Sequence, residues 1–450
     1  METNYSEINE NINFLKIEND ITENKSVIVN VKLQNSKHLE ENSMKEIKGG
    51  VTSAKGFKAA GAEAAIKYQN RKDMAMVYSE VPCQVAGTFT SNVVKAACVL
   101  WDKEVVAHSA YGPAVVVNSG IANACTGKQG YDCCKKTAQA AAEALNIPEE
   151  SVLVASTGVI GMQLPVDRIT AGVEKLAGML ADSEEAGTLA AEAIMTTDTR
   201  SKQAAVTFEI GGKTVTLGGM CKGSGMIHPN MCTMLGFLTT DLAISKELLQ
   251  EALRENVQDT FNMVSVDGDT STNDTLLILA NGMAGNDMIT EKNEDYDKFM
   301  EALNYVNTKM AKMMAGDGEG ATALLETKVI HAKTKQEAKI LAKSVICSSL
   351  TKAASFGHDA TWGRILCALG YAGVDFDPEN VELFFQGENG TIQIFKDGVA
   401  CDYSEEEASK ILAEPEVRIL VDMKSGDAEA CAWGCDLTYD YVKINAEYTT

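Results

Sequence analysis

The sequence predicts an α+β fold, with a layered α/β/β/α core domain and a second, smaller α/β domain. Short β-branched runs alternate with amphipathic helical stretches from Gly49 onward, and two pairs of these runs are separated by glycine-containing turns. The 450 residues are enough for two or three domains. Hairpins mixed with helices favour a layered architecture over a doubly wound parallel sheet.

The β-branched and apolar runs predict strands at residues 114–118, 152–156, 204–210, 214–217, 275–280, 328–332, 381–386, 391–395 and 417–423. Gly211-Gly212 joins one pair and Glu388-Asn389-Gly390 joins another, so both pairs are expected to form hairpins. A further run, 437–443, has a strand-like pattern shortly before the C-terminus.

Two helices have clear signals. Ser245 can cap a helix whose apolar face runs from Leu248 to Val257. Apolar residues repeat at helical spacing from Phe299 to Met314, and Gly316 is placed to end that helix. We interpret the methionines of this second helix as core packing.

Composition argues against several classes of function. The 40 basic and 63 acidic residues give a net charge of −23, which disfavours a nucleic-acid or anionic-membrane surface. We find no membrane-spanning run and no signal-like apolar segment, so a cytoplasmic protein is expected. The 12 cysteines are interpreted as reduced core thiols, and the five histidines lack metal-ligand spacing, so no metal site is expected. Residues 1–48 are rich in Asn, Glu, Ser and Lys and are expected to form a poorly ordered polar extension.

The most informative stretch is residues 222–235, KGSGMIHPNMCTML. Its two glycines and its proline disfavour a regular helix or central strand, while Met231, Met234 and Leu235 suggest that it is buried. If the Cys232–Thr233 bond broke, Thr233 would carry a hydroxyl and a free α-amine that can act as its base. A buried threonine that only satisfies a hydrogen bond is the alternative.

Other segments could supply partners for such a nucleophile. The loop Ser156-Thr157-Gly158 follows a predicted strand and could form an oxyanion hole, or be a plain glycine turn. Lys222 could hold a substrate carboxylate, although an isolated lysine is usually solvated. Glu319, between two glycines, is a carboxylate on a mobile loop that suits an amine. The C-terminus could reach the site if the strand-like run anchors it.

Together these residues resemble the ornithine acetyltransferase family, also called glutamate N-acetyltransferase, of arginine biosynthesis. The resemblance runs from Gly49 to Thr450 and includes a series of motifs in the same order, namely 55–61, 118–120, 123–127, 156–158, 196–198, 222–235, 267–275, 317–322, 362–365 and 444–450.

The resemblance implies an N-terminal-nucleophile-like enzyme that cleaves itself at Cys232–Thr233. Residues 49–232 would then belong to an α chain and residues 233–450 to a β chain that begins at the nucleophile. Thr233 would take the acetyl group from N2-acetyl-L-ornithine and pass it to L-glutamate in a ping-pong cycle, which makes ornithine and N-acetylglutamate.

By the same resemblance, Thr157 and Gly158 stabilise the oxyanion. The substrate site would be lined by Thr196, Lys222, Thr233, Glu319, Asn445 and Thr450. The family suggests two α and two β chains. No cofactor is expected, because no cofactor motif is found and the acetyl group would arrive on the substrate. It leaves open whether acetyl-CoA is a second acetyl donor, which would make the enzyme bifunctional.

Three positions depart from the family's usual residues. Cys232 replaces alanine before the nucleophile, Ile121 replaces asparagine, and Ala360-Thr361 replaces Pro-Asn. Cysteine is small, so cleavage is still expected, while Ile121 could perturb a loop near the site. Two alternatives remain open: an N-terminal-threonine amidohydrolase or aminopeptidase that passes the acyl group to water, and an unprocessed relative kept for binding or assembly.

Overall fold

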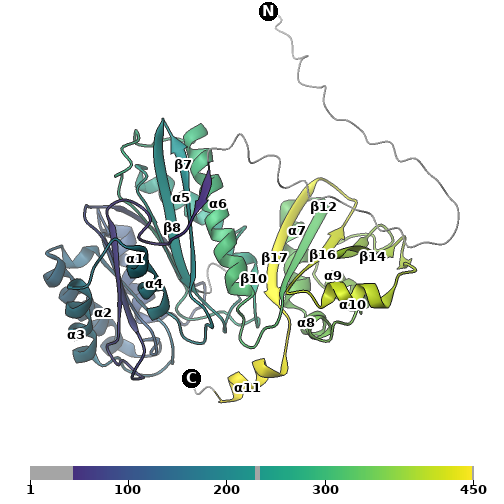
Figure 1. The fold of residues 1–450 in the computed structure, drawn as a ribbon, viewed down its shortest axis with the longest axis horizontal. Helices are drawn as coiled ribbons and strands as arrows, with labels where there is room; N and C mark the ends of the chain where they lie inside the picture. The colour runs from purple at the N-terminus through teal and green to yellow at the C-terminus, as the bar shows by residue number, and fades with distance from the viewer. Residues whose placement is uncertain (1–43, 229–233, 448–450) are drawn as a thin grey trace, which may run out of the picture.

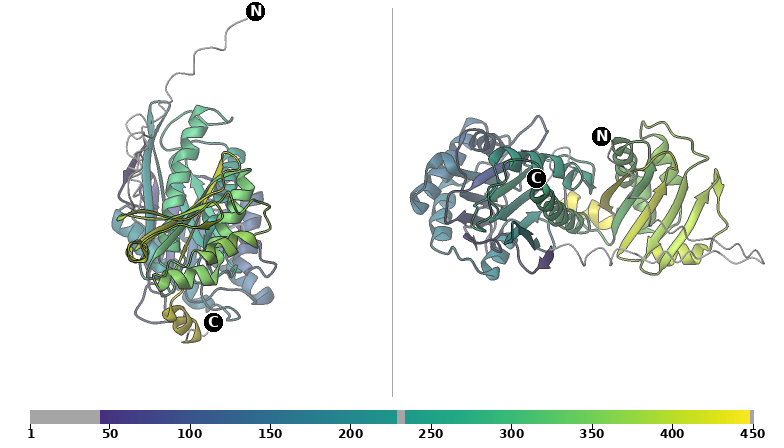
Figure 2. Two further views of the ribbon diagram at one scale, coloured as in Figure 1. Left: turned by 90° about the vertical axis from the view of Figure 1, so that its right-hand side faces the viewer. Right: turned by 90° about the horizontal axis from the view of Figure 1, so that it is seen from above.

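The computed structural model describes residues 44–228 and 234–447. Cys232, Thr233 and Thr450 lie outside the described residues, as does most of the predicted extension 1–48. Two lobes are visible in Figure 1, one with two stacked sheets and one with a single sheet. The views in Figure 2 show the same division into two lobes.

The first lobe contains a six-stranded sheet at its centre. Its strands, in spatial order, are β1 (Lys45–Ile47), β7 (Lys202–Ile210), β8 (Lys213–Lys222), β9 (Leu235–Thr240), β11 (Thr275–Ala280) and β4 (Gln84–Phe89). Only the β9–β11 pair is parallel among these described strands. The β7–β8 hairpin turns at Gly211 and Gly212, whose φ angles of 54° and 71° suit a tight two-residue turn.

A four-stranded sheet packs against the first. It comprises β2 (Phe57–Ala62), β3 (Met74–Ser79), β5 (Ala114–Asn118) and β6 (Val152–Ser156). Side chains of both sheets, including Val77, Val116, Phe237 and Leu277, share one buried core. The central strands β5, β6, β9 and β11 are buried along their whole length, because both faces of each sheet are covered there.

Helices cover the outer face of each sheet. The four-stranded sheet is covered by α1 (Ala97–His108), α2 (Gly127–Leu145), α3 (Val166–Ala177) and α4 (Glu184–Ala193), with a short 3-10 turn at Glu149–Ser151. The six-stranded sheet is covered by α5 (Lys246–Val257) and α6 (Glu294–Ala315). The 3-10 turn Phe261–Met263 lies between these two helices in the sequence. This order of layers confirms the predicted α/β/β/α core.

The predicted helix signals are also confirmed. The Ser245 side chain accepts a hydrogen bond from the Leu248 N–H and caps α5. Helix α6 ends at Ala315, with Gly316 as its C-cap, and its Met310 and Met314 are buried. Because α6 also contacts β17 of the second lobe, one hydrophobic core continues from α5 and α6 into that lobe.

The second, smaller lobe contains a seven-stranded mixed sheet with helices. Its strands, in spatial order, are β10 (Val264–Ser265), β17 (Ala428–Cys435), β12 (Leu324–Ala332), β16 (Glu416–Asp422), β13 (Glu382–Gly387), β14 (Gly390–Lys396) and β15 (Val399–Ala400). Its helices are α7 (Lys335–Cys347), α8 (Ser349–Phe356), α9 (Gly363–Gly370) and α10 (Glu405–Leu412). The predicted α/β character of the second domain is therefore confirmed.

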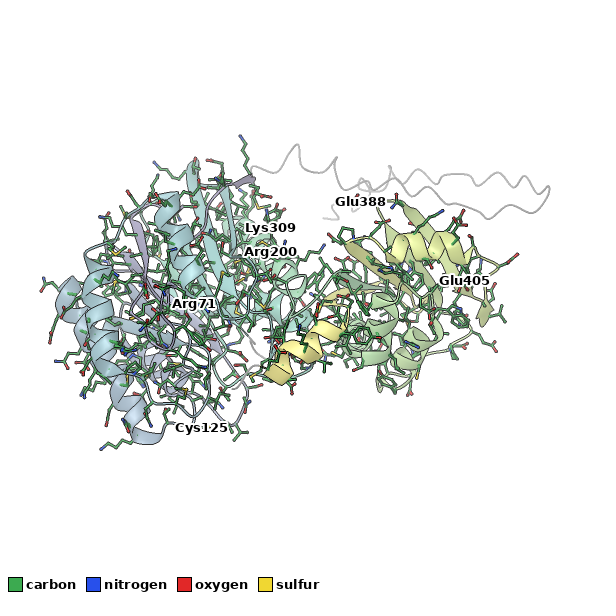
Figure 3. The ribbon with its side chains drawn as sticks, turned by 60° about the horizontal axis from the view of Figure 1, so that its bottom comes forward. Arg71, Cys125, Arg200, Lys309, Glu388 and Glu405 are labelled. Atoms are coloured by element: carbon green, nitrogen blue, oxygen red, sulfur yellow. The ribbon has the colours of Figure 1, made fainter. Side chains whose placement is uncertain are left out.

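Three sequence predictions need correction. The folded part begins before Gly49, because β1 at Lys45–Ile47 pairs with β7. Strand β8 continues to Lys222, where an irregular segment was expected to begin. The run 437–443 is not a strand: most of it lies in helix α11 (Tyr439–Glu447), which leaves the second lobe and reaches back toward the first (Figure 3). An exposed segment without neighbouring strands cannot form a ladder, whereas a helix satisfies its backbone internally.

In the described part of the chain, no helix combines the length and the apolar character that crossing a membrane would require.

Candidate active site

Three neighbouring strands of the six-stranded sheet meet at the candidate site. Lys222, the last residue of β8, pairs with Leu235, the first residue of β9. Leu235 in turn pairs with Thr275, the first residue of β11. Met234, which follows Thr233 in sequence, is buried at this edge and accepts a hydrogen bond from the Thr275 N–H at 2.8 Å.

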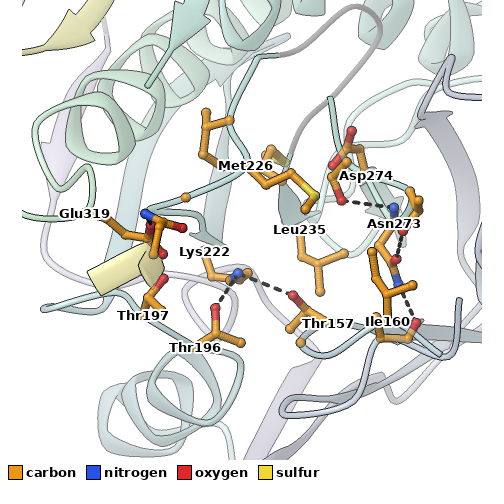
Figure 4. A pocket seen from close by; sticks show the side chains of 18 residues that line it. Thr157, Ile160, Thr196, Thr197, Lys222, Met226, Leu235, Asn273, Asp274 and Glu319 are labelled. Carbon is orange, nitrogen blue, oxygen red and sulfur yellow. Dashed lines mark hydrogen bonds between the residues drawn. The ribbon is translucent and has the colours of Figure 1, made fainter. Parts of the chain in front are cut away.

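A pocket of about 110 Å³ opens at this edge of the sheet (Figure 4). Six of the residues predicted for the site line it, and they come from distant parts of the sequence. These residues are Thr157, Gly158, Thr196, Lys222, Glu319 and Asn445. The fold thus brings together every predicted site residue that the structure describes.

Lys222 is the cation at the centre of this pocket. Its Nζ donates to the Thr196 Oγ1 at 2.8 Å and to the Thr157 Oγ1 at 3.3 Å (Figure 4). It is only 7% exposed, so it is not the solvated lysine that is the usual case. Burial lowers the pKa of Lys222, while the nearby carboxylate of Asp198 acts in the opposite direction.

Lys222 lies beside a buried ion cluster that consists of Asp198, Lys202 and Asp317. Asp198 accepts from the Lys202 Nζ at 2.7 Å and from the Gly223 N–H at 2.7 Å, and it lies 4.0 Å from the Lys222 Nζ. Lys202 also pairs with Asp317 at 2.5 Å. Burial acts to raise the pKa of Asp198, but Lys222 and Lys202 outweigh it and lower that pKa to about 2. Lys202 was not predicted for the site, since residue type alone does not distinguish a buried lysine from a solvated one.

The Thr157–Gly158 loop presents hydrogen-bond donors to the pocket. Gly158 has a φ of 126°, and a Cβ there would lie 2.3 Å from the carbonyl carbon of Gly120, so only glycine fits. The Thr157 N–H already donates to the Asn118 carbonyl at 3.0 Å. Because the Thr157 hydroxyl accepts from Lys222, its own hydrogen can point to another group in the pocket.

Glu319 and Asn445 form the opposite wall. The Asn445 Nδ2, on α11, donates to the Glu319 Oε2 at 2.7 Å. The Glu319 N–H donates to the Ser224 carbonyl at 3.0 Å. Glu319 is 8% exposed, so the expectation of a carboxylate on a mobile loop is wrong. Gly225 allows this packing, because a Cβ there would lie 2.4 Å from the Glu319 carboxylate.

Two further pocket residues were missed as individual candidates, although their motif 267–275 was recognised. The Asn273 Nδ2 donates to the Ala122 carbonyl at 2.6 Å and to the Ser156 carbonyl at 2.8 Å, which connects the start of β11 to the Ser156–Gly158 loop. Asp274 is 2% exposed, and burial raises its pKa well above the ordinary value.

Ile121, one of the departures from the expected pattern, packs without disturbing the loop. Its side chain is buried, and its carbonyl accepts from the Asn118 Nδ2 at 2.9 Å. Its backbone bridges to Thr157 and Val159, so the loop keeps its hydrogen bonds with an apolar side chain at this position.

A family model and individual relatives both identify the chain with the ArgJ family. The family model described as ArgJ family matches residues 58–450. The Arginine biosynthesis bifunctional protein ArgJ of Symbiobacterium thermophilum is 52% identical over 409 residues, which cover 90% of this chain and 100% of that protein. Arginine biosynthesis bifunctional protein ArgJ 1 of Clostridium acetobutylicum is 51% identical over 399 residues, covering 88% of this chain and 97% of that protein.

A solved structure of ornithine acetyltransferase from Mycobacterium tuberculosis, complexed with ornithine, is also similar. It is 41% identical, covers 42% of this chain and 98% of the solved chain, and has a TM-score of 0.39.

Proposed function

The chain belongs to the ArgJ family, and from that premise we propose that it transfers an acetyl group from N2-acetyl-L-ornithine to L-glutamate. The products are ornithine and N-acetylglutamate, in the cyclic route of arginine biosynthesis. Thr233 is the nucleophile and carries the acetyl group between the two half-reactions. This proposal is supported mainly by one observation: six predicted site residues line the same pocket, which Met234 also lines.

The enzyme first cleaves its own chain. The Thr233 hydroxyl attacks the carbonyl of Cys232, the peptide nitrogen becomes the α-amine of Thr233, and water hydrolyses the resulting ester. This gives an α chain that ends at Cys232 and a β chain that begins with a hydroxyl and an amine on one residue. The small side chain of Cys232 is compatible with this attack.

The acyl transfer then uses the amine as a base. The α-amine takes the proton from the Thr233 hydroxyl as its oxygen attacks the acetyl carbonyl. The Thr157 hydroxyl and the Gly158 N–H are the donors available to the developing oxyanion, since the Thr157 N–H is bonded to Asn118. The proton passes to the leaving amine of ornithine, and glutamate reverses these steps from the acetyl-enzyme.

The charges of the pocket suit both amino acids. The Lys222 ammonium, with the Thr196 hydroxyl beside it, suits a carboxylate, while Glu319 and Asn445 suit an ammonium group. Thr450 belongs to the same proposed set of substrate-binding residues.

No cofactor is needed, because the acetyl group arrives on the substrate. Acetyl-CoA is proposed as an additional acetyl donor, in line with the word bifunctional in the relatives' names. The α and β chains remain together as α2β2 in the cytoplasm.

Two measurements test the proposal. Purified protein should give two bands of similar size on a denaturing gel, and Thr233→Ala should give one full-length band without activity. Cleaved protein incubated with N2-acetylornithine and glutamate should release ornithine. Absence of ornithine from cleaved protein would exclude the transferase, whereas ornithine release that does not depend on glutamate would identify a hydrolase.

A further inference from the structure

The two amino acids of the proposed reaction place different demands on the active-site pocket. Both react at the α-nitrogen, so their α-carboxylates must occupy the same position. Their side chains end in opposite charges, an ammonium in ornithine and a carboxylate in glutamate. Glu319 attracts the first and repels the second. Among the residues that the structure describes, Lys222 is the only basic side chain that lines this pocket, so one carboxylate of glutamate lacks a cation there.

A second pocket adjoins the first. It has a volume of about 170 Å³ and is lined by Tyr68, Arg71, Gly120 and Thr196, and we call it the side pocket. Thr196 lines both pockets, and its hydroxyl accepts the hydrogen bond from Lys222. The backbone of Gly120 also touches Gly158 of the active-site pocket, because a Cβ on Gly158 would lie 2.3 Å from the Gly120 carbonyl carbon. The two pockets therefore share a wall.

Arg71 supplies a cation to the side pocket. It lies in the loop between β2 and β3 on the first lobe (Figure 3) and is partly buried. Its Nη2 donates to the Met195 carbonyl at 2.7 Å, which fixes the guanidinium beside the residue that precedes Thr196. A guanidinium has five N–H donors, and this bond uses one of them. The other donors of Arg71 are therefore available to a ligand in the side pocket.

The loop that carries Arg71 is held in place by its own hydrogen bonds. The buried Asp73 carboxylate accepts from two backbone N–H groups of this loop, at 2.7 and 2.6 Å. Lys67, in the same loop, places its ammonium 5.0 Å from the centre of the Tyr68 ring and adds a second positive charge near the side pocket. In a chain with a net charge of −23, this local positive charge suits an anionic group.

The spacing between the two cations matches the length of glutamate. The Met195 carbonyl oxygen and the Thr196 hydroxyl oxygen are joined by five covalent bonds, so they lie at most about 5 Å apart. Hydrogen bonds of 2.7 and 2.8 Å on either side place the Arg71 Nη2 within about 11 Å of the Lys222 Nζ. An extended glutamate with an ordinary hydrogen bond at each carboxylate spans up to about 12 Å. One glutamate molecule can therefore contact both cations.

We propose that the side pocket binds the side-chain carboxylate of glutamate, and that Arg71 determines the specificity for this acceptor. This inference rests on the proposed function. Lys222 and Thr196 hold the α-carboxylate of either substrate, and the substrate side chain then takes one of two directions. The ornithine ammonium turns to Glu319 and Asn445, whereas the glutamate carboxylate turns to Arg71. A guanidinium offers a carboxylate charge-assisted hydrogen bonds, and it repels an ammonium group.

Steady-state kinetics of the cleaved protein tests this assignment, because kcat/KM for each substrate of a ping-pong enzyme reports on its own half-reaction. Arg71→Gln should lower kcat/KM for glutamate by about 10- to 100-fold and leave kcat/KM for N2-acetylornithine within about twofold of the wild-type value. Lys72→Gln is the matched control, because it removes the same charge from the next position of the loop. Lys72 pairs with Glu192 at 3.0 Å and lines neither pocket, so both values should stay unchanged in this control.

The contrast between the two substrates separates a binding role from a structural one. Arg71→Lys keeps the positive charge and should recover part of the lost kcat/KM for glutamate. An unchanged kcat/KM for glutamate in Arg71→Gln would overturn the assignment. An equal fall for both substrates would also overturn it, since that result would mean that Arg71 only holds the Met195–Thr196 segment in place. Failure of the wild-type protein to release ornithine would instead overturn the proposed function.

Discussion

Replacing Lys202 by methionine should destabilise the first lobe by several kcal/mol. Lys202 is fully buried between Asp198 and Asp317, with N–O distances of 2.7 and 2.5 Å. Methionine fills a similar volume but removes the ammonium group that pairs with both carboxylates, which leaves Asp198 with only Lys222, at 4.0 Å. Removing one partner of a buried pair costs about 3–5 kcal/mol, which is a large share of the roughly 5–15 kcal/mol of a typical domain.

The shift in the pKa of Asp198, which Lys222 and Lys202 cause together, sets an upper limit on the part of this loss that Asp198 contributes. Its pKa in the folded protein is about 2, compared with an ordinary value of 3.8. The difference corresponds to about 2 kcal/mol. Because the folded pKa is depressed, this stability is fully present above pH 3.8 and is lost as the pH falls toward 2. The penalty of Lys202→Met should therefore be largest near pH 7 and shrink in acid.

Urea denaturation followed by circular dichroism measures the effect, in a Thr233→Ala background that keeps the chain in one piece. Lys312→Met is a suitable control, because Glu326 retains Arg418 at 2.5 Å and Lys312 is partly exposed. That control should cost about 1 kcal/mol or less. Two results would refute the role given to this ion cluster. One is a urea unfolding midpoint of Lys202→Met equal to that of the control, and the other is a loss of unfolding free energy that does not become smaller in acid.

Three further predictions concern the pocket. Gly158→Ala should leave the rest of the fold intact but reduce ornithine release by at least about 100-fold, measured as kcat on cleaved protein, because its Cβ would meet the Gly120 backbone and displace a proposed oxyanion donor. Gly225→Ala should raise KM for acetylornithine more than it lowers kcat, because its Cβ would push against the Glu319 carboxylate. Asn445→Ala should raise KM by about tenfold, since a lost hydrogen bond to a charged group is worth about 1.5–3 kcal/mol, and an unchanged KM would place Glu319 outside the substrate site.

Local signals in the sequence account for the elements that were predicted well. The Ser245 cap and the Gly211-Gly212 turn each act through the backbone within a few residues, so they can be recognised without the tertiary fold. The run 437–443 was mispredicted because β-branched residues indicate a strand only where a neighbouring strand exists. Whether α11 has such a neighbour depends on the fold as a whole.

The candidate site divides in the same way. Residues within recognised family motifs, such as Thr157 and Glu319, could be predicted for the site from the sequence alone. The buried ion pair of Lys202 and Asp317 could not be predicted in this way, because its two residues lie more than a hundred positions apart in the sequence. Asp274 lies within a recognised motif, but its burial and its place beside Met234 follow only from the register of β9 and β11.

The position of the proposed cleavage bond in the topology explains why cleavage need not separate the chains. The bond lies in the connection between β8 and β9, which are adjacent antiparallel strands. After cleavage, β9 and β11 would belong to the β chain, and they are inserted between β8 and β4 of the α chain. Ladder hydrogen bonds and the core between the two sheets therefore hold the new chain on both sides. Cleavage would free two chain ends within this connection while the sheet stays paired, and one of these ends, Thr233, is the residue proposed to react.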